Sequence, residues 1–321
     1  MKRLWPWLRL LLGVAILVAL GARLGTHAFL DGLRAVNGWS ILAALGIGLL
    51  TTVFSAWRWC VIARRLDLPL TLGTAVADYY RGLLLNAVLP AGVLGDVHRA
   101  VNHGKQSGDV SRGLRAVFFE RSAGQVVLVG IGLVVLLTQP ALAGGLVPGG
   151  AVVLTTLVVL AAAAAFVALN GRARRALLAT WADARTSLFA RRALPAVVVL
   201  SAATVAGHIA LFVVAARAAG SSAPVGRLVP LIVLALLVMA VPINIGGWGP
   251  REAFLAVAFG AAGLGAAQGL TTAVVYGVLA MVSSLPGVLV LFRGRTSATE
   301  QVEVLPERLD QPRQQVLALA G

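Results

Sequence analysis

Charged residues are scarce in this chain of 321 residues. They make up 12% of it, whereas hydrophobic residues make up 59%, and the mean hydropathy is +0.90. A soluble domain carries about 25% charged residues, which it needs to cover its surface. The composition therefore excludes an ordinary soluble protein and predicts a polytopic membrane protein.

Cysteine and histidine are scarcer still. Cys60 is the single cysteine of the sequence, which excludes an internal disulfide and a multi-cysteine metal site. The four histidines, at 27, 98, 103 and 208, do not have the spacing of metal ligands. We therefore expect no metal site and no cofactor.

Acidic residues are outnumbered: 12 acids face 27 basic residues, giving a net charge of +15. In a soluble protein this excess would indicate a nucleic-acid partner. Most of the basic residues here flank apolar runs, however, which indicates contact with membrane lipids and no nucleic acid.

Six apolar segments are long enough to cross a bilayer as helices, which takes about 20 residues. They are 8–26, 39–60, 116–137, 150–169, 194–216 and 270–292. The first resembles a signal peptide, but five more spans follow it, so we interpret it as an uncleaved helix. The expected fold is all-α.

The basic residues predict the orientation of the chain, because they gather on the cytoplasmic side of a membrane. One side holds 21 of them, and the opposite side holds only Arg23, Arg34, Arg217 and Arg227. The larger group includes Arg58, which flanks the second span. Both termini are therefore expected in the cytoplasm. Abundant Ala, Gly and Arg with scarce Lys indicates a bacterial source, and so a bacterial cytoplasmic membrane.

Two further apolar stretches, 71–97 and 229–266, are interrupted by proline and glycine. A single crossing by either would put a basic cluster on the wrong side, so we interpret both as broken re-entrant helical hairpins. Two tight full crossings are the alternative for 229–266. The expected helix breaks contain Pro90, Gly92, Gly95, Pro242, Gly246, Gly247 and Gly249.

The two halves of the chain contain the same series of elements. Residues 1–137 and 150–292 each hold two spans, a broken segment and a third span, with opposite topology. Paired interrupted segments in inverted halves point to a transporter site; chance recurrence in an Ala/Gly/Arg-rich chain is the alternative. We expect a transmembrane domain at 1–295 and a disordered cytoplasmic tail at 296–321.

Charged residues beside the two breaks are the candidate binding residues. A half-helix that begins after a break directs free N–H groups and a positive dipole at its ligand, which favours an anion. Arg99 and Arg251 add forked donors for phosphate or carboxylate. Asp96 lies one turn before Arg99 and can pair with it in an empty site. The other candidates are Glu120, Arg121, Asn244, Trp248 and Glu252.

Structural roles are the alternative for these residues. The neighbours at 251–252 are also compatible with a buried ion pair, and those at 120–121 with snorkelling to the lipid headgroups. We interpret His208, within the fifth span, as a partner in a helix–helix hydrogen bond in preference to a proton relay.

Three motifs resemble signatures of the lysylphosphatidylglycerol synthase transmembrane-region family, also called flippase-like proteins. Residues 90–100 (PAGVLGDVHRA) resemble its PGGxxGDxxRA motif, the pair at 120–121 resembles its ER pair, and residues 245–253 (IGGWGPREA) resemble its sxGGwGxREa motif. Ala91 and Pro250 depart from the pattern without removing a charged group.

The resemblance implies a membrane domain that binds or moves polar-headed lipids. Members include the flippase half of bifunctional synthases, where a separate soluble domain performs aminoacyl transfer, and we expect no room for that domain in this chain. We therefore expect translocation of an anionic or polyprenyl-linked lipid, without enzyme activity. The alternatives are a non-transporting partner of a lipid or glycolipid synthase and, less favoured, a membrane-embedded lipid-modifying enzyme.

Overall fold

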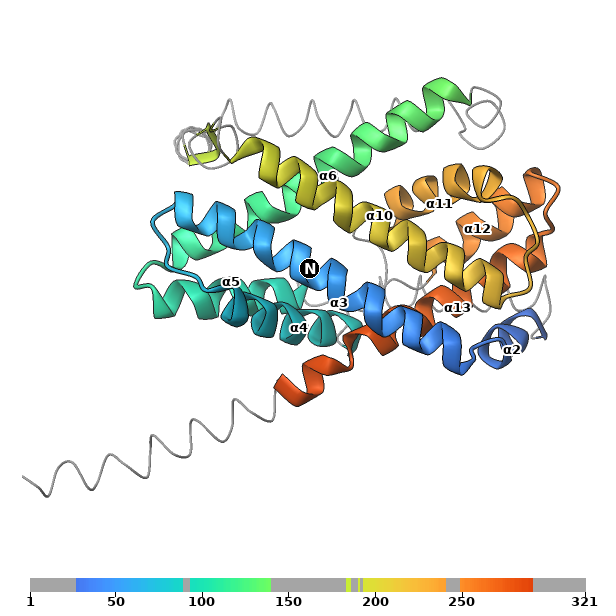
Figure 1. Cartoon of the computed structure of the whole chain (residues 1–321), viewed down its shortest axis with the longest axis horizontal. Helices are drawn as coiled ribbons and strands as arrows, with labels where there is room; N and C mark the ends of the chain where they lie inside the picture. Colours follow the sequence, from blue (N-terminus) through green and yellow to red (C-terminus); the bar gives the residue numbers. More distant parts are fainter. Residues whose placement is uncertain are drawn as a thin grey trace, which may run out of the picture.

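Four long apolar helices dominate the structure, a computed structural model that describes residues 27–88, 93–139, 183–185, 190, 193–240 and 249–290 (Figure 1). They are α3 (Gly38–Arg65), α6 (Val110–Thr138), α10 (Leu194–Ala218) and α13 (Ala266–Ser284), and the last continues as an apolar span to Val290. Each is long and apolar enough to cross a membrane. Four of the six predicted spans are thus confirmed, and the segments 8–26 and 150–169 lie outside the described residues.

Shorter helices occupy the two interrupted stretches. They are α4 (Leu72–Val88) with α5 (Leu94–Gln106), and α11 (Val225–Ala240) with α12 (Pro250–Ala261). At 1.5 Å per residue they are roughly 18 to 26 Å long, less than the roughly 30 Å of a bilayer core. The interruption of both stretches is confirmed, and the re-entrant path stays a prediction. The break residues Pro90, Gly92, Pro242, Gly246 and Gly247 lie outside the described residues.

Gly95 is not a helix break, so the prediction for this residue is wrong. It lies in the first turn of α5, where a Cβ atom would collide with the carbonyl oxygen of Gly82 on α4. The side chain of Asn86 fastens the same turn. It accepts a hydrogen bond from the N–H of Gly95 at 2.7 Å and donates one to Asp96 at 3.3 Å. The glycine therefore permits close backbone packing between α4 and α5.

Gly249 does mark the start of a helix, as predicted for the second break. It is the N-cap of α12 and has a φ of +103°, a conformation that favours glycine. Its N–H donates to Oε2 of Glu252 at 2.6 Å, so this acid satisfies a free amide at the helix start. Pro250 follows at the first helical position, where its missing N–H costs nothing.

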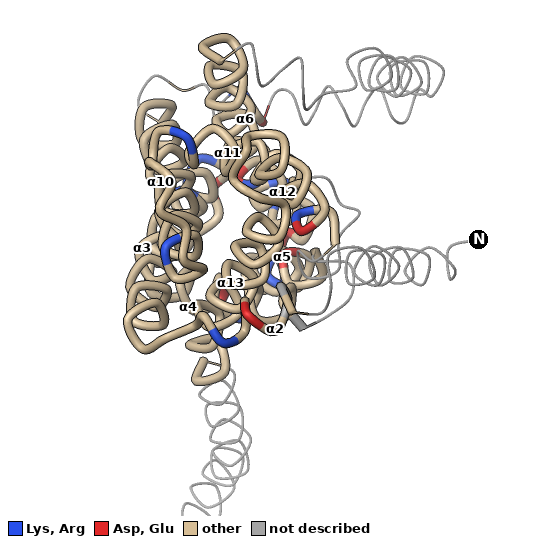
Figure 2. The backbone as a smooth tube through the Cα atoms, turned by 90° about the vertical axis from the view of Figure 1, so that its right-hand side faces the viewer, with Lys and Arg blue, Asp and Glu red and all other residues tan. Residues whose placement is uncertain are grey.

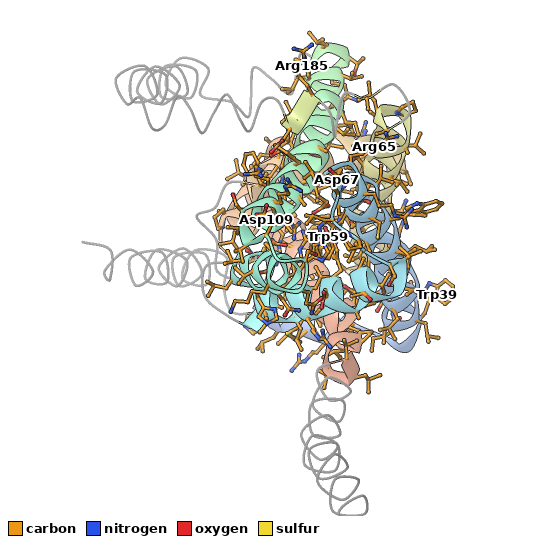
Figure 3. The ribbon with its side chains drawn as sticks, turned by 90° about the vertical axis from the view of Figure 1, so that its left-hand side faces the viewer. Trp39, Trp59, Arg65, Asp67, Asp109 and Arg185 are labelled. Carbon is orange, nitrogen blue, oxygen red and sulfur yellow. The ribbon has the colours of Figure 1, made fainter. Side chains whose placement is uncertain are left out.

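The helices pack in two apolar clusters that share α3, α6 and α10. One cluster joins these three helices to α4 and α5, and the other joins them to α11, α12 and α13. α3 lies beside α10, and Figure 2 shows this pair opposite α5, α12 and α13. Figure 3 shows Trp59 of α3 directed into the protein and Trp39 directed outward.

Each half packs its second short helix closely on the span that follows. A Cβ atom on Gly113 of α6 would meet the carbonyl oxygen of Ala100 on α5, and one on Gly269 of α13 would meet that of Leu255 on α12. The pairs α5–α6 and α12–α13 therefore share one mode of contact, with a glycine of the span against the backbone of the short helix.

Candidate functional site

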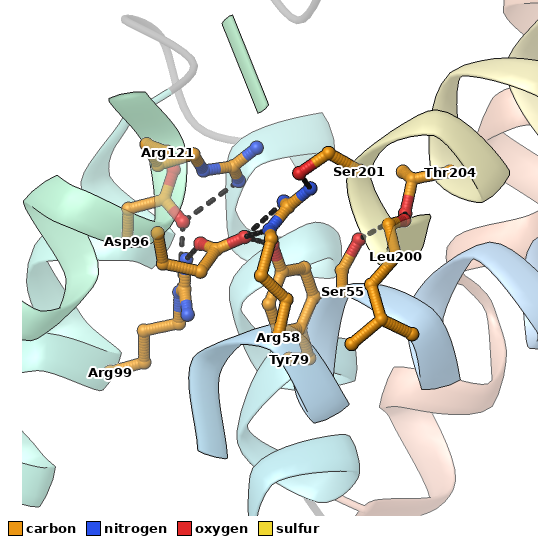
Figure 4. A network of polar contacts seen from close by, with 10 residues as sticks. Ser55, Arg58, Tyr79, Asp96, Arg99, Arg121, Leu200, Ser201 and Thr204 are labelled. Atoms are coloured by element: carbon orange, nitrogen blue, oxygen red, sulfur yellow. Dashed lines mark hydrogen bonds and ion pairs between the residues drawn. The ribbon is translucent and has the colours of Figure 1, made fainter. Parts of the chain in front are cut away.

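Five charged side chains from α3, α5 and α6 form one hydrogen-bonded group, which we call the arginine cluster (Figure 4). Its members are Arg58, Asp96, Arg99, Glu120 and Arg121. Three guanidinium groups face two carboxylates, so the cluster carries one net positive charge when all five groups are ionised.

Glu120 of α6 is the centre of the cluster. Its Oε1 accepts hydrogen bonds from Nε and Nη2 of Arg58, the former at 3.0 Å, and from the hydroxyl of Tyr79 on α4 at 2.9 Å. Its Oε2 accepts from Nη2 of Arg99 at 2.6 Å. The side chain is 0% exposed, so the snorkelling interpretation is wrong for this residue. Glu120 thereby joins α3, α4, α5 and α6.

Arg99 of α5 is buried, with 1% of its side chain exposed. Its Nε donates to Oδ1 of Asp96 at 2.9 Å, which confirms the pairing of these two residues. Its guanidinium lies 4.3 Å from the ring centroid of Tyr79 and 4.7 Å from that of Trp59. Both contacts fall within the range of cation–π attraction, which helps to stabilise the buried charge.

Arg121 of α6 differs from the other two arginines because 42% of its side chain is exposed. Its Nη2 donates to Oδ1 of Asp96 at 2.8 Å, the one hydrogen bond that it makes among the described residues. A guanidinium has five N–H donors. Arg121 is therefore anchored to the cluster and keeps donors for a ligand.

A cavity of about 210 Å³ lies beside the cluster, between α3, α4, α6, α10 and α13. Arg58, Arg121 and Tyr79 line one part of it, and apolar side chains such as Leu83 and Leu128 line another. No acidic residue is among the described residues that line it. The cavity wall thus carries the guanidinium groups of Arg58 and Arg121, whereas their carboxylate partners, Glu120 and Asp96, are not part of the wall.

Residues 7–287 match the model of one family, the lysylphosphatidylglycerol synthase TM region. The chain belongs to this family. Its membership confirms the resemblance carried by the three sequence motifs, and with the four spanning helices it makes the chain a multi-pass membrane protein. No curated protein matches the chain, and no solved structure does.

The motif residues of this family member occupy two distinct places. Of the predicted binding residues that the structure describes, Arg121 alone lines the cavity; Asp96, Arg99 and Glu120 lie behind it in the arginine cluster. Asn244 and Trp248 lie outside the described residues.

Arg251 and Glu252, at the start of α12, also lie outside the cavity lining. Nε and Nη2 of Arg251 donate to Oε1 of Glu252, the former at 2.9 Å, and both side chains are buried. The guanidinium of Arg251 lies 5.3 Å from the ring centroid of Tyr276 on α13, and this tyrosine lines the cavity. The pair therefore meets the cavity through an aromatic ring, as Arg99 does through Tyr79.

His208 has the structural role that its sequence suggests. Its Nδ1 lies 3.4 Å from the hydroxyl of Tyr276, which links α10 to α13, and the ring of Phe212 stacks on Tyr276 at 3.5 Å. The interpretation as a helix–helix hydrogen-bond partner is confirmed. His208 also lines the cavity.

Two features of the site escaped the sequence interpretation. The prediction that Arg58 flanks a span as an interfacial residue is wrong, because it is buried and bonded to Glu120 and, at 3.0 Å, to Ser201 of α10. The second feature is a group of hydroxyl side chains that line the cavity. They are Thr51, Thr52 and Ser55 of α3, Ser201 and Thr204 of α10, and Ser283 of α13.

A sequence signal for these hydroxyls does exist. Thr51 and Ser55 are four residues apart and Ser201 and Thr204 are three apart, so each pair lies on one face of its helix. Polar residues at this spacing in an otherwise apolar span indicate a face that is turned away from lipid.

Among the described residues, no group of three histidine, cysteine or acidic side chains is arranged to hold a metal ion. The described cavity wall carries guanidinium groups, hydroxyls and aromatic rings, together with the amide of Gln125 and the imidazole of His208.

Proposed function

We propose that this protein binds the anionic headgroup of a membrane lipid in the cavity and moves that lipid across the bilayer. The observation that carries the proposal is Arg121, which lies with Arg58 on a cavity that no described acidic residue lines. A guanidinium matches phosphate with two parallel hydrogen bonds. Charged side chains within a membrane domain are costly, which favours a functional role.

The arginine cluster suits reversible binding of an anion. Its net positive charge is compensated when a singly charged headgroup enters. Asp96, which bonds to both Arg99 and Arg121, holds Arg121 in place while the site is empty. The headgroup then accepts hydrogen bonds from the remaining N–H groups of Arg121, and the acyl or prenyl chains stay in lipid.

Movement of the lipid would follow from rocking of one half of the domain against the other. An inverted repeat would supply the two halves, and the shared glycine contacts of α5–α6 and α12–α13 support it. The basic residues support a location in the bacterial cytoplasmic membrane with both termini in the cytoplasm, and without the buried Arg58 and Arg99 their distribution is still 19 to four.

The proposed role is binding and transport without catalysis. Thr51, Thr204 and Ser283 all donate their hydroxyl hydrogens to backbone carbonyl oxygens, and Ser201 accepts a hydrogen bond from a guanidinium. A hydroxyl that donates its hydrogen to a carbonyl oxygen is not hydrogen-bonded to a general base that would activate it as a nucleophile. Recruitment of a lipid or glycolipid synthase is the second candidate, and the test below separates it from transport.

The test is the identity of the lipids that co-purify in mild detergent, measured by mass spectrometry. The wild type is compared with Arg121→Gln and with Arg112→Gln, a matched control on the same helix whose side chain is 47% exposed and lies outside the cavity. One anionic or lipid-linked species should be enriched in the wild type and in Arg112→Gln, and lost in Arg121→Gln.

Identical bulk phospholipids in all three preparations would contradict headgroup binding. Transport is tested in vesicles that contain a fluorescent analogue of the enriched lipid, by the rate at which the analogue becomes accessible to an external quencher. Binding that depends on Arg121 without acceleration of this rate would favour the role of a synthase partner.

A further inference from the structure

The hydroxyl-lined wall of the cavity narrows the choice of headgroup. We infer that the lipid bound there is a phosphodiester whose headgroup carries neutral hydroxyl groups, such as a glycerol, an inositol or a sugar, and is not a cationic aminoacyl headgroup. The inference rests on the proposed function and specifies the substrate of that site.

Three hydroxyls of the wall have already used their hydrogen atoms. Thr51 donates to the carbonyl oxygens of residues 47 and 48 at 3.0 Å, Thr204 to that of residue 200 at 2.8 Å, and Ser283 to that of residue 280 at 2.7 Å. A hydroxyl group has one hydrogen to donate and two lone pairs that accept. These side chains therefore offer the cavity acceptors, and they suit a ligand that supplies donors.

The row of acceptors leads toward the guanidinium groups. Oγ of Ser55 lies 3.4 Å from Oγ1 of Thr204, and because Thr204 donates to a carbonyl, Ser55 is the donor in this contact. Oγ of Ser201 accepts from Nη1 of Arg58 at 3.0 Å. Figure 4 shows Thr204, Ser55, Ser201 and Arg58 in succession. A matching headgroup has its anion at the arginine end and hydrogen-bond donors along the wall.

Charge decides which kind of donor fits. Both hydroxyl and ammonium groups donate hydrogen bonds, but an ammonium group in the cavity would face Arg58 and Arg121 with no carboxylate among the described lining residues. Like charges repel, and this repulsion selects against a headgroup of the wrong charge. Neutral hydroxyls avoid the repulsion, so the geometry favours a polyol.

The test compares three lipids with identical oleoyl chains, bound to the detergent-purified full chain and quantified by native mass spectrometry. Phosphatidylglycerol carries the polyol, phosphatidylpropanol carries the same phosphodiester and three carbons without hydroxyls, and lysyl-phosphatidylglycerol adds ammonium groups. We expect phosphatidylglycerol to bind about tenfold more tightly than phosphatidylpropanol, as two ordinary hydrogen bonds would give, and lysyl-phosphatidylglycerol to bind more weakly than phosphatidylglycerol.

Removal of acceptors should reduce this preference. In Thr51→Val/Thr204→Val, which keeps the acceptor of Ser283, phosphatidylglycerol should bind only about threefold better than phosphatidylpropanol, whose own affinity stays unchanged. Thr138→Val is the matched control, because Thr138 makes the same bond to a backbone carbonyl, at 2.8 Å, on an exposed part of α6. Ser283→Ala, a smaller change, should weaken phosphatidylglycerol about threefold, so the inference stays testable if the double variant does not fold.

The outcomes separate this inference from the proposed function. Equal affinities for phosphatidylglycerol and phosphatidylpropanol in the wild type, both reduced in Arg121→Gln, would overturn the polyol inference and leave the anion site intact. Tightest binding of lysyl-phosphatidylglycerol, or an equal loss of affinity in Thr138→Val, would overturn it as well. If Arg121→Gln left the affinities for all three lipids unchanged, this result would instead contradict the proposed function.

Discussion

The two interrupted segments each place an arginine against a tyrosine that lines the same cavity, yet their surroundings differ. Arg99 lies 4.3 Å from the ring centroid of Tyr79, and Arg251 lies 5.3 Å from that of Tyr276. Around the first arginine, charged side chains from three helices meet at Glu120. The second has an acid from its own helix turn as its ion-pair partner.

The difference shows that an arginine–glutamate pair has a different structural role in each region. Glu252 bonds to its neighbour Arg251 and to the N–H of Gly249, so its bonds organise the start of α12. Glu120 bonds to groups between 21 and 62 residues away, so its bonds hold separate helices together. The region around Glu120 is therefore a junction between helices, whereas Glu252 stabilises the start of one helix.

The largest expected difference between the regions follows loss of either acid. Glu120→Gln should lower the free energy of unfolding by about 3–5 kcal/mol, because it leaves two buried arginines without their shared carboxylate. Glu252→Gln should cost about 1.5–3 kcal/mol, since one arginine and one amide lose a charged acceptor. Denaturant unfolding of the purified protein measures both losses, and equal values would contradict the distinction.

The close contact between the first pair of short helices has no counterpart among the described glycines of the second pair. Gly95→Ala should therefore cost about 1–3 kcal/mol, because the new methyl group meets the backbone of Gly82. Gly260→Ala in α12 is the matched variant, and its methyl group would be in ordinary contact with Ala266. It should be neutral or stabilise the helix by up to about 1 kcal/mol. Thermal unfolding measures both changes. An equal loss of stability in the two variants would contradict this asymmetry.

The smallest expected difference concerns the two tyrosines. Tyr79→Phe removes a 2.9 Å hydrogen bond to a carboxylate, whereas Tyr276→Phe removes a 3.4 Å contact with the imidazole of His208. Hydrogen bonds to charged groups are the stronger kind, so the first variant should lose about 1 kcal/mol more than the second. Both keep the ring against its arginine, which makes them controls for each other. A greater loss in Tyr276→Phe would reverse the comparison.

Much of the fold was predictable from hydropathy alone. Each span such as 39–60 or 194–216 is a continuous apolar run, and the interruptions at proline and glycine are local signals. Arg99 and Asp96 could be paired because they are one helical turn apart. Position along the helix also explains Gly249, which was predicted correctly as the residue before α12.

The rest depended on contacts between helices that no local pattern encodes. Arg58 stands near the end of an apolar run, as an interfacial residue does, and only the packing of α3 against α6 reveals its bond to Glu120. Gly95 resembles a break because it follows Pro90, and only the approach of α4 reveals its packing role. The hydroxyl face likewise became a cavity wall through the association of α3 with α10.

The fastening of α4 to α5 has a mechanical consequence. The backbones of Gly82 and Gly95 are in direct contact, which leaves little room for α4 and α5 to shift against each other. The two hydrogen bonds of Asn86 also join the end of α4 to the start of α5. The two helices therefore form a single rigid unit. Any rotation of this unit against α6 moves Tyr79 and Arg99 together, so their hydrogen bonds to Glu120 would change in length at the same time.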